Sequence, residues 1–415
     1  MYNRDLINPM LTGEQLIEAL RILPKYDDTI RDRDKSTRLV ALSDLYNIYL
    51  PSVMSEEIYS KLYLSLLRSL NKKETINAVR QANENFKAVK RMSYQGIIGG
   101  SDSFTIIGCS GIGKSSAISR AVDLITYKPF VEFNQTKICP IVVVQCPFDS
   151  SVKGLAFEIL RNIDDVLETK YYSNALRSHA TTDVLIGIIS QVSLYHIGLL
   201  IIDEIQNVAS SKNGRTFINA LTQLINNSGV SICMVGTPEC KVFFEQQLQL
   251  ARRSMGLEYT PLQYDCYFEN FCRTVFRFQY TRHQTELEAG ILERLYEYSG
   301  GLVSLVVSLL HDAQEIAIIT GSESLNLASL NEAFQKRTAM LHGYLERYKI
   351  KIPVTTKTKS TTEQLIPTTK QVLLNNNFSF VEVVEQAKKS RYDVVEVLKQ
   401  YITIEEIGKE GCKKC

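Results

Sequence analysis

The residues with the most specific chemistry are Gly108-Cys109-Ser110-Gly111-Ile112-Gly113-Lys114-Ser115. They follow an apolar run, 104–107, and precede a helix-compatible run, 116–125, which is the strand–loop–helix context of a phosphate-binding loop. The glycines let successive backbone N–H groups turn inward, and the free N–H groups of the helix complete an anion site. A glycine-rich turn that binds nothing is disfavoured by this context. The sequence therefore predicts a nucleoside triphosphate site formed by Gly108, Cys109, Ser110, Gly111, Ile112, Gly113, Lys114, Ser115 and Ser116.

Two side chains of the loop and two later carboxylates would do the chemistry. Lys114 is expected to reach the β- and γ-phosphates, and the Ser115 hydroxyl to bind Mg²⁺. A second apolar run, 198–202, ends in Asp203 and Glu204, as in a Walker B strand. Asp203 would hold Mg²⁺ through water, and Glu204 would deprotonate the attacking water. The alternative is a buried strand that ends in a charged turn, and the complete phosphate loop upstream disfavours it.

Three more residues are candidates for contact with the γ-phosphate. Thr237 follows the apolar run 230–236, and ligands of open α/β sheets bind at the carboxyl ends of parallel strands. Capping of a helix that begins near Glu239 is an equal alternative for Thr237. Arg252 and Arg253 end the apolar run 248–251, where a guanidinium could act as an arginine finger on a neighbouring subunit. A solvated pair at a helix carboxyl end is the alternative for these arginines.

Composition sets broad limits on the class of protein. The chain has 415 residues, enough for two or three domains, and its 45% apolar and 22% charged residues are typical of a soluble globular protein. A net charge of +2 neither requires nor excludes nucleic acid. We expect no signal peptide and no membrane helix. Nine scattered cysteines favour a reducing, cytoplasmic setting, and the C-x-x-C at Cys412 and Cys415 lacks the second ligand pair of a structural zinc site.

Elements that would position these residues alternate between strands and helices over 91–282. Strands are predicted at 104–107, 139–145, 198–204, 230–236 and 273–280. Helices are predicted to begin near Val152, capped by Ser150 or Ser151, and near Thr181. Such alternation predicts an α/β fold, with a parallel sheet covered by helices.

The flanking regions are predicted to be helical. In an N-terminal region, 1–90, residues 1–35 should form an extended arm with little core, and helices should follow at 39–50, 55–70 and 74–92. These helices could pack on the next domain or dock a partner, and both alternatives stay open. After the nucleotide domain, helices 284–299, 302–320 and 327–348 would form a bundle within 283–350. Residues 351–370 read as a linker and 371–415 as an interaction tail.

Taken together, these motifs resemble those of AAA+ ATPases, and more narrowly of TnsC and TniB, the AAA+ regulators of DNA transposition. The resemblance covers about residues 37–348. Leu-Ala-Arg-Arg at Leu250 to Arg253 is one of the motifs that carry it. The more specific signs are Asp-Glu-Ile-Gln at Asp203 to Gln206, Gly-Thr-Pro-Glu at Gly236 to Glu239, and the region 47–70. It implies an AAA+ P-loop fold with a C-terminal helical lid and a helical N-terminal extension.

The resemblance also implies a function. Proteins of this kind bind ATP with Mg²⁺ between adjacent subunits and assemble as rings or helical filaments around duplex DNA. They bridge a target selector to the transposase, and ATP hydrolysis limits the lifetime of the assembly. By position, Arg253, with Arg252 as substitute, would be the finger and Thr237 the first sensor. One departure is Ser304, which stands where many lids carry a second-sensor arginine, so hydrolysis should be slow or differently gated.

DNA contacts are expected to be sequence-independent and made to phosphates. Lys153 and Thr181 or Thr182 lie on helix starts that face the DNA in similar proteins. Plain capping and a solvated lysine are the alternatives for these residues. Two other functions remain open: a replication-type AAA+ initiator or loader, and a signalling NTPase that does not bind DNA.

Overall fold

The computed structural model describes residues 7–74, 103–133, 136–241 and 256–337. All of them lie in Met1–Lys351, a compact unit of the chain. Several predictions fall outside the described residues. They concern the finger candidates Arg252 and Arg253, the predicted helix 74–92 apart from its first residue, the linker 351–370, and the tail 371–415 with its C-x-x-C motif.

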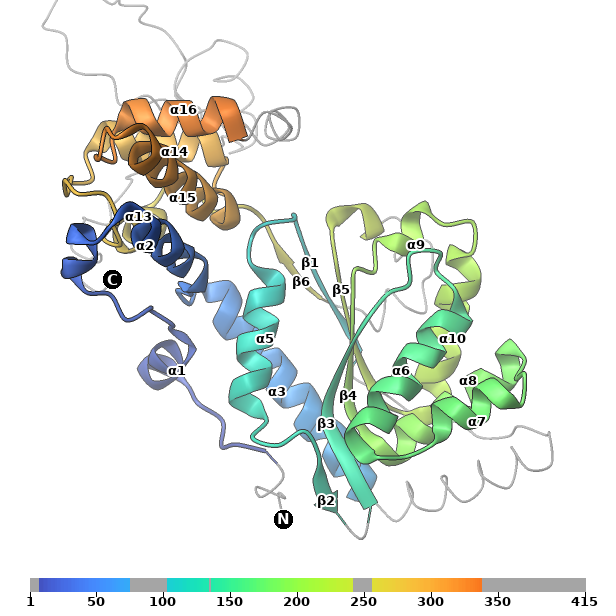
Figure 1. Cartoon of the computed structure of the whole chain (residues 1–415). Coiled ribbons are helices and arrows are strands. Elements are labelled where there is room, and N and C mark those ends of the chain that lie inside the picture. The colour runs from blue at the N-terminus through green and yellow to red at the C-terminus, as the bar shows by residue number, and fades with distance from the viewer. Residues whose placement is uncertain (1–6, 75–102, 134–135, 242–255, 338–415) are drawn as a thin grey trace, which may run out of the picture. The chain divides into compact units, whose positions relative to one another are not determined.

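A six-stranded sheet with the order β2-β3-β4-β5-β1-β6 forms the centre of the nucleotide domain (Figure 1). Its strands are β1 Phe104–Gly108, β2 Val131–Phe133, β3 Thr136–Gln145, β4 Ile197–Asp203, β5 Ser231–Gly236 and β6 Leu257–Tyr259. All neighbouring pairs are parallel except β2 and β3. Strand β5 separates β1, which leads into the phosphate loop, from β4, which ends in the carboxylates. Because these strands are parallel, their carboxyl ends meet at one edge of the sheet.

Helices cover both faces of this sheet (Figure 1). Helices α3 Val53–Glu74 and α5 Lys114–Ile125 lie on one face, and α6 Val152–Leu167, α8 Thr182–His196 and α10 Gly214–Ser228 lie on the other. Leu199 and Ile201 of β4 pack into the first layer, whereas Leu200 and Ile202 pack into the second. A strand buried on both faces needs a continuous apolar run, as the sequence has. The predicted α/β fold is confirmed.

Helix starts in this domain follow the predicted capping chemistry. The Ser151 hydroxyl accepts a hydrogen bond from the Gly154 N–H at 3.2 Å, and the Thr181 hydroxyl accepts one from the Val184 N–H at 3.5 Å. Shorter helices α7 Tyr171–Arg177 and α9 Asn207–Ser210 complete this side of the domain, with the 3-10 turn η3 Pro238–Cys240 after β5.

The strand predicted at 273–280 is wrong. The first half of this segment, 273–276, is the end of helix α13, Cys266–Phe276, which the Asp265 carboxylate caps by accepting the Phe268 N–H at 3.0 Å. The buried side chains of α13 recur at helical spacing, and a window that begins at Arg273 shows only the last of them. The outer strand beside β1 is instead the short β6.

The predicted lid, 283–350, contains helices α14 Ala289–Ser299, α15 Val303–Thr320 and α16 Leu327–Arg337, and helix α13 of the preceding segment packs on α15. Helices α14 and α15 end at Gly300 and Gly321, whose φ angles of 58° and 82° favour glycine. Among the described helices, α15 alone is long and apolar enough to cross a membrane by length and composition, a test that a buried core helix also passes. Its side chains are mostly buried against the other lid helices, so α15 is the core helix of the lid.

The predicted extended arm at 1–35 is also wrong. Helix α1, Gly13–Leu20, buries Leu16 and Leu20 in the core that covers the α5 face of the sheet. Arg120 of α5 donates to the Ala19 carbonyl at 3.0 Å, and the Asn8 side chain donates to the Leu124 carbonyl at 2.8 Å. The helix predicted at 39–50 is divided into α2, Lys35–Ala41, and the 3-10 helix η2, Leu42–Asn47, and a second 3-10 helix, η1, spans Asp28–Asp32. Residues 7–74, here called the N-terminal segment, therefore pack on the core, as one of our two alternatives required.

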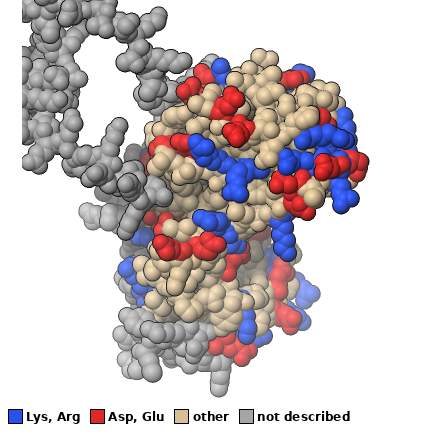
Figure 2. Space-filling view, turned by 90° about the vertical axis from the view of Figure 1, so that its left-hand side faces the viewer, with Lys and Arg blue, Asp and Glu red and all other residues tan. Residues whose placement is uncertain are grey.

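The N-terminal segment also holds the lid. The Arg38 guanidinium is 1% exposed and pairs with both oxygens of Glu323 at 2.6 and 2.7 Å. It also donates to the Tyr280 carbonyl at 3.0 Å, and Lys35 donates to the Ile319 carbonyl at 2.7 Å. Figure 2, which shows the left side of Figure 1, has Lys and Arg mixed with Asp and Glu across this face. Local ion pairing, rather than a field of one sign, characterises this surface.

Replacing Arg38 with alanine should destabilise the protein by about 3 kcal/mol, because Glu323 would lose its partner in a largely buried position. Urea unfolding followed by circular dichroism measures this loss. Hydrogen bonds from Arg38 lower the pKa of Glu323, so the stabilisation is present at neutral pH and is lost as the pH falls through that depressed pKa. The matched control is Arg273→Ala, which breaks an exposed pair with Glu269 and should cost about 0.5 kcal/mol or less. Equal losses in both variants would contradict this role of Arg38.

Candidate nucleotide-binding site

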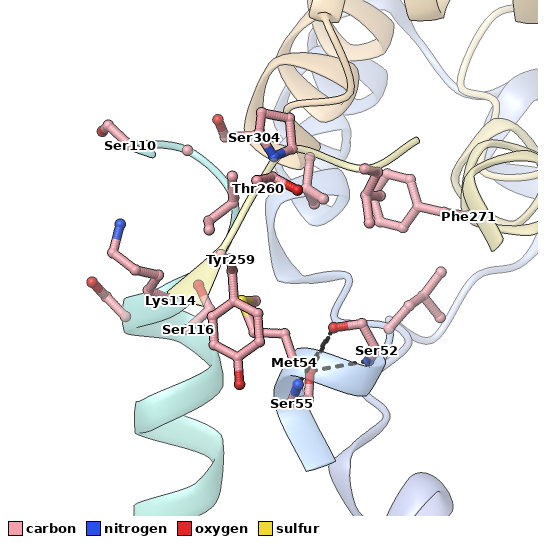
Figure 3. Close-up of a pocket in the computed structure, with 18 of the residues that line it drawn as sticks. Ser52, Met54, Ser55, Ser110, Lys114, Ser116, Tyr259, Thr260, Phe271 and Ser304 are labelled. Atoms are coloured by element: carbon pink, nitrogen blue, oxygen red, sulfur yellow. Dashed lines mark hydrogen bonds between the residues drawn. The ribbon is translucent and has the colours of Figure 1, made fainter. Parts of the chain in front are cut away.

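A cavity of about 780 Å³ lies at the carboxyl edge of the sheet. The phosphate loop and the ends of β4, β5 and β6 form one part of its wall, and the N-terminal segment and the lid form the rest. Figure 3 shows Lys114 and Ser116 at the start of α5, with Met54, Tyr259 and Ser304 on other parts of the wall. The size and the mixed lining suit a small-molecule ligand.

The phosphate loop has the backbone that its glycines predict. Gly111 and Gly113 have φ angles of 85° and 97°, and a Cβ at Gly111 would lie 2.4 Å from the Ser304 hydroxyl oxygen. Lys114 is buried, and its ammonium donates to the carbonyls of Gly108 at 2.6 Å and Cys109 at 2.9 Å. Burial lowers the pKa of Lys114, while the nearby Asp203 carboxylate acts in the opposite direction. The loop therefore combines a fixed cation with the open amino end of α5.

Ser115 and Asp203 meet as the sequence predicts. The Ser115 hydroxyl donates to Asp203 Oδ2 at 3.2 Å, and Asp203 Oδ1 accepts the Glu204 N–H at 2.8 Å. A hydroxyl and a carboxylate beside a phosphate loop are oxygen donors of the kind that Mg²⁺ prefers, with water and phosphate completing its shell. The residues present therefore fit a magnesium ion bound with a nucleotide.

Glu204 has an unusual backbone and a defined side-chain partner. Its φ of 58° is in the left-handed region, where a residue with a Cβ is strained. Gln206 Nε2 donates to the Glu204 carboxylate, and Gln206 Oε1 accepts the Thr237 N–H at 3.3 Å. A Cβ at Gly236 would lie 2.9 Å from Gln206 Oε1, so a larger residue at this strand end would displace the Gln206 amide. Gln206 thus joins the end of β4 to the end of β5.

This role of Gln206 was not predicted from the sequence, where Gln206 was considered only as the last residue of the Asp-Glu-Ile-Gln motif. The sequence signal that could have indicated it is an amide side chain two positions after Glu204, just beyond the buried strand β4. Thr237, in contrast, lies where we predicted, between β5 and η3, and lines the cavity. Its side chain makes no capping hydrogen bond, which removes the capping alternative.

The lid contacts the phosphate loop through Ser304. The Ser304 N–H donates to the Gly111 carbonyl at 3.0 Å, and Leu302 and Leu305 pack on Cys109 and Ile112. The serine that stands in place of the second-sensor arginine therefore contacts the loop backbone. The lid is attached to the loop by a main-chain hydrogen bond and a small apolar cluster.

Away from the loop, the cavity becomes apolar. Figure 3 shows Phe271 on this side, and the Tyr267 hydroxyl donates to the Pro51 carbonyl at 3.0 Å. Apolar lining residues in the same cavity include Ile48, Leu50, Pro261, Leu262 and Val307. This lining fits a flat aromatic base, and its contribution from the N-terminal segment was not predicted.

The predicted DNA contacts are not part of this cavity. Lys153 is exposed in the first turn of α6, and Thr181 and Thr182 lie at the start of α8. No hydrogen bond joins Lys153 to either threonine in the part of the chain that the structure describes. The structure therefore assembles the phosphate loop, Asp203, Glu204 and Thr237 at one site, and leaves these three residues on the surface.

Fold and site together are those of a P-loop nucleotide-binding domain of the AAA+ type. The family model described as bacterial TniB protein matches residues 79–262, which contain the loop, both carboxylates and Thr237. The resemblance to an AAA+ ATPase of the TniB type is thereby confirmed over this segment. A search of curated proteins finds no match to the chain.

Several solved structures share part of this arrangement. The Aeropyrum pernix ORC2 protein in its ADP form is 16% identical, with a TM-score of 0.39 and coverage of 64% of this chain and 69% of that chain. The Aeropyrum pernix ORC1 protein in complex with DNA is 15% identical, with a TM-score of 0.38 and coverage of 62% and 63%. Drosophila ORC bound to DNA is 9% identical, with a TM-score of 0.39 and coverage of 86% and 83%. These scores are low, and the AAA+ assignment rests on the strand order, the site and the family match.

Proposed function

We propose that this protein is an ATP-dependent regulator of DNA transposition. It would assemble on duplex DNA as a ring or filament, bridge a target selector to the transposase, and disassemble after ATP hydrolysis. The observation that carries this proposal is the contact of Ser115 with Asp203, next to Glu204, inside the segment that matches the TniB family.

The reaction at this site would be transfer of the γ-phosphoryl group to water. Loop N–H groups and Lys114 would bind the phosphates, and Ser115 and Asp203 would hold Mg²⁺, which neutralises charge on the phosphate oxygens. Water would attack the γ-phosphorus, its proton would pass to the Glu204 carboxylate, and ADP would leave. Thr237 would contact the γ-phosphate, and Arg253 of a neighbouring subunit, or Arg252 in its place, would complete the site.

DNA contact and partner binding belong to the same proposal. Lys153, Thr181 and Thr182 would contact phosphates of the duplex, independent of its sequence. We propose that the chain divides into an N-terminal extension, 1–90, a nucleotide-binding domain, 91–282, a lid, 283–350, a linker, 351–370, and a tail, 371–415. The tail would recruit the transposase, and the protein would act in the cytoplasm. The family match over 79–262 and the surface positions of Lys153, Thr181 and Thr182 support the DNA contacts, and the sequence pattern of 351–415 supports the linker and the tail.

One imaging experiment tests the proposal. Purified protein is mixed with duplex DNA and either a non-hydrolysable ATP analogue or ADP, and examined by negative-stain electron microscopy. Rings or filaments on DNA with the analogue alone are expected. Monomers in every condition would contradict the proposal and favour a signalling NTPase. A pull-down with a co-encoded transposase would then separate a transposition regulator from a replication-type initiator or loader.

Gln206 should position Glu204 for hydrolysis. We expect Gln206→Ala to lower kcat roughly 10- to 100-fold with little change in the KM for ATP, because small displacements of a catalytic group have effects of this size. Steady-state phosphate release measures both constants. Gln206→Asn retains the amide on a shorter chain and should recover part of kcat. A rise in KM at constant kcat would instead show that Gln206 acts in nucleotide binding.

A further inference from the structure

Two loops at the carboxyl edge of the sheet are joined into one surface. The first, 146–151, connects β3 to α6, and the second, 211–213, connects α9 to α10; Figure 1 shows α9 beside the first loop. The Ser211 hydroxyl and the Asn213 amide both donate to the Asp149 carbonyl, at 3.0 and 3.3 Å. The Asn207 amide donates to the Cys146 carbonyl at 3.0 Å. Residues far apart in sequence are therefore held side by side.

Three exposed cations lie on this surface: Lys153, Lys212 and Arg215. Within the residues that the structure describes, none of them has an ion pair or a side-chain hydrogen bond. Lys153 and Arg215 lie in the first turns of α6 and α10, which contain no acidic residue. A cation there opposes the helix dipole, whereas a bound anion would interact favourably with both the dipole and the cation. The one nearby acid on the first loop, Asp149, accepts the Ser151 N–H at 2.9 Å.

An aromatic ring stands among these cations. Phe148 is 91% exposed, and the next residue but one, Ser150, has a left-handed φ of 51°. The phenyl ring of Phe148 belongs to none of the buried apolar clusters formed by the described residues. Cations beside an exposed ring match a sugar–phosphate backbone, since phosphates pair with the cations and the ring packs on a sugar. An acidic peptide would use the charges but would not require the ring.

We propose that Phe148, Lys153, Lys212 and Arg215 form a contact surface for duplex DNA. It deepens the proposed function, on which it rests, by adding a second loop and an aromatic side chain to the predicted contact at Lys153. This surface differs from the face in Figure 2, where charges of both signs are mixed. The partner is bound through its backbone, and the contact is independent of base sequence.

The test compares variants of the full chain on fluorescent duplex DNA, with a non-hydrolysable ATP analogue, over a range of salt concentrations. Lys212→Ala/Arg215→Ala should weaken binding about tenfold or more and reduce the slope of log affinity against log salt by about 2, since each phosphate contact contributes about 0.9. Phe148→Ala should weaken binding with an unchanged slope. The control Lys25→Ala/Lys128→Ala removes two exposed cations elsewhere and should bind as the parent does.

The outcomes separate this inference from the proposed function. A parent protein that binds nucleotide but no DNA would contradict the proposed function itself. A parent that binds DNA, with both loop variants binding equally well at an equal salt slope, would overturn the inference alone. Thermal melting and nucleotide affinity report on folding. If the double alanine variant unfolds, two other variants test the inference. Phe148→Ala must lose affinity for duplex DNA, and Lys212→Arg/Arg215→Lys, which keeps both charges, must retain it.

Discussion

Replacement of Lys114 by alanine is expected to lower ATP affinity by about 100-fold or more and to abolish assembly on DNA. The ammonium is buried and fixed by the Gly108 and Cys109 carbonyls, so it meets the phosphates with little loss of conformational entropy. A charge pair formed out of water with a phosphate is stronger than the same pair at the surface. Calorimetric titration with ATP and imaging on DNA measure the two losses.

Stability separates a binding defect from misfolding in this variant. Burial already disfavours the charged form of Lys114, so its removal should change the free energy of unfolding by about 1 kcal/mol or less. Lys128→Ala, an exposed lysine just beyond α5, is the matched control for ATP binding. A Lys114→Ala protein that is folded and binds ATP normally would contradict the predicted phosphate site.

The Glu204→Gln variant is expected to retain ATP binding and assembly while hydrolysis falls about 10²- to 10⁴-fold, the usual contribution of a general base. The amide has nearly the shape of the carboxylate but does not accept a proton at neutral pH. Assemblies on DNA should therefore persist after dilution, when those of the parent protein dissociate. Phosphate release and the lifetime of DNA-bound complexes measure the two effects.

The opposite behaviour of the two variants is informative. Glu18→Gln, on the surface of α1, serves as the charge-matched control and should behave as the parent. Short-lived assemblies in Glu204→Gln, together with slow hydrolysis, would show that disassembly is not driven by turnover. In that case Lys114 would be required for the complex to form, but ATP hydrolysis at Glu204 would not set how long the complex lasts.

Much of the site followed from sequence because its parts are local. The loop, its helix and the apolar run before Asp203 each carry their signal within one short stretch, and parallel pairing brings their ends together. Gln206 escaped notice because its partner Thr237 comes from a different strand, and hydrogen bonds between distant segments leave no local pattern. Ser304 was read as a missing arginine, whereas the structure shows its backbone bound to Gly111.

Errors in the fold have equally specific causes. The run 273–280 alternates briefly, but its apolar residues complete a helical stripe that begins at Phe268. Strand β6 is short and lies at the edge of the sheet, so few side chains mark it. Helix α1 was mistaken for an arm because only Leu16 and Leu20 face the core, and its stability comes from packing on α5.

The N-terminal segment forms part of the wall of the nucleotide cavity and therefore belongs to the same domain as the sheet. Residues from Tyr46 to Ser55 line the nucleotide cavity, Ile22 pairs with Tyr49, and Arg38 binds Glu323 of the lid. The nucleotide-binding unit therefore extends beyond the sheet in both directions along the sequence, with its first part ahead of the phosphate loop and its last part after the sheet. A fragment cut at the boundaries of the sheet would contain the phosphate loop but lose helix α3, which covers one face of the sheet, and the enclosure around the base.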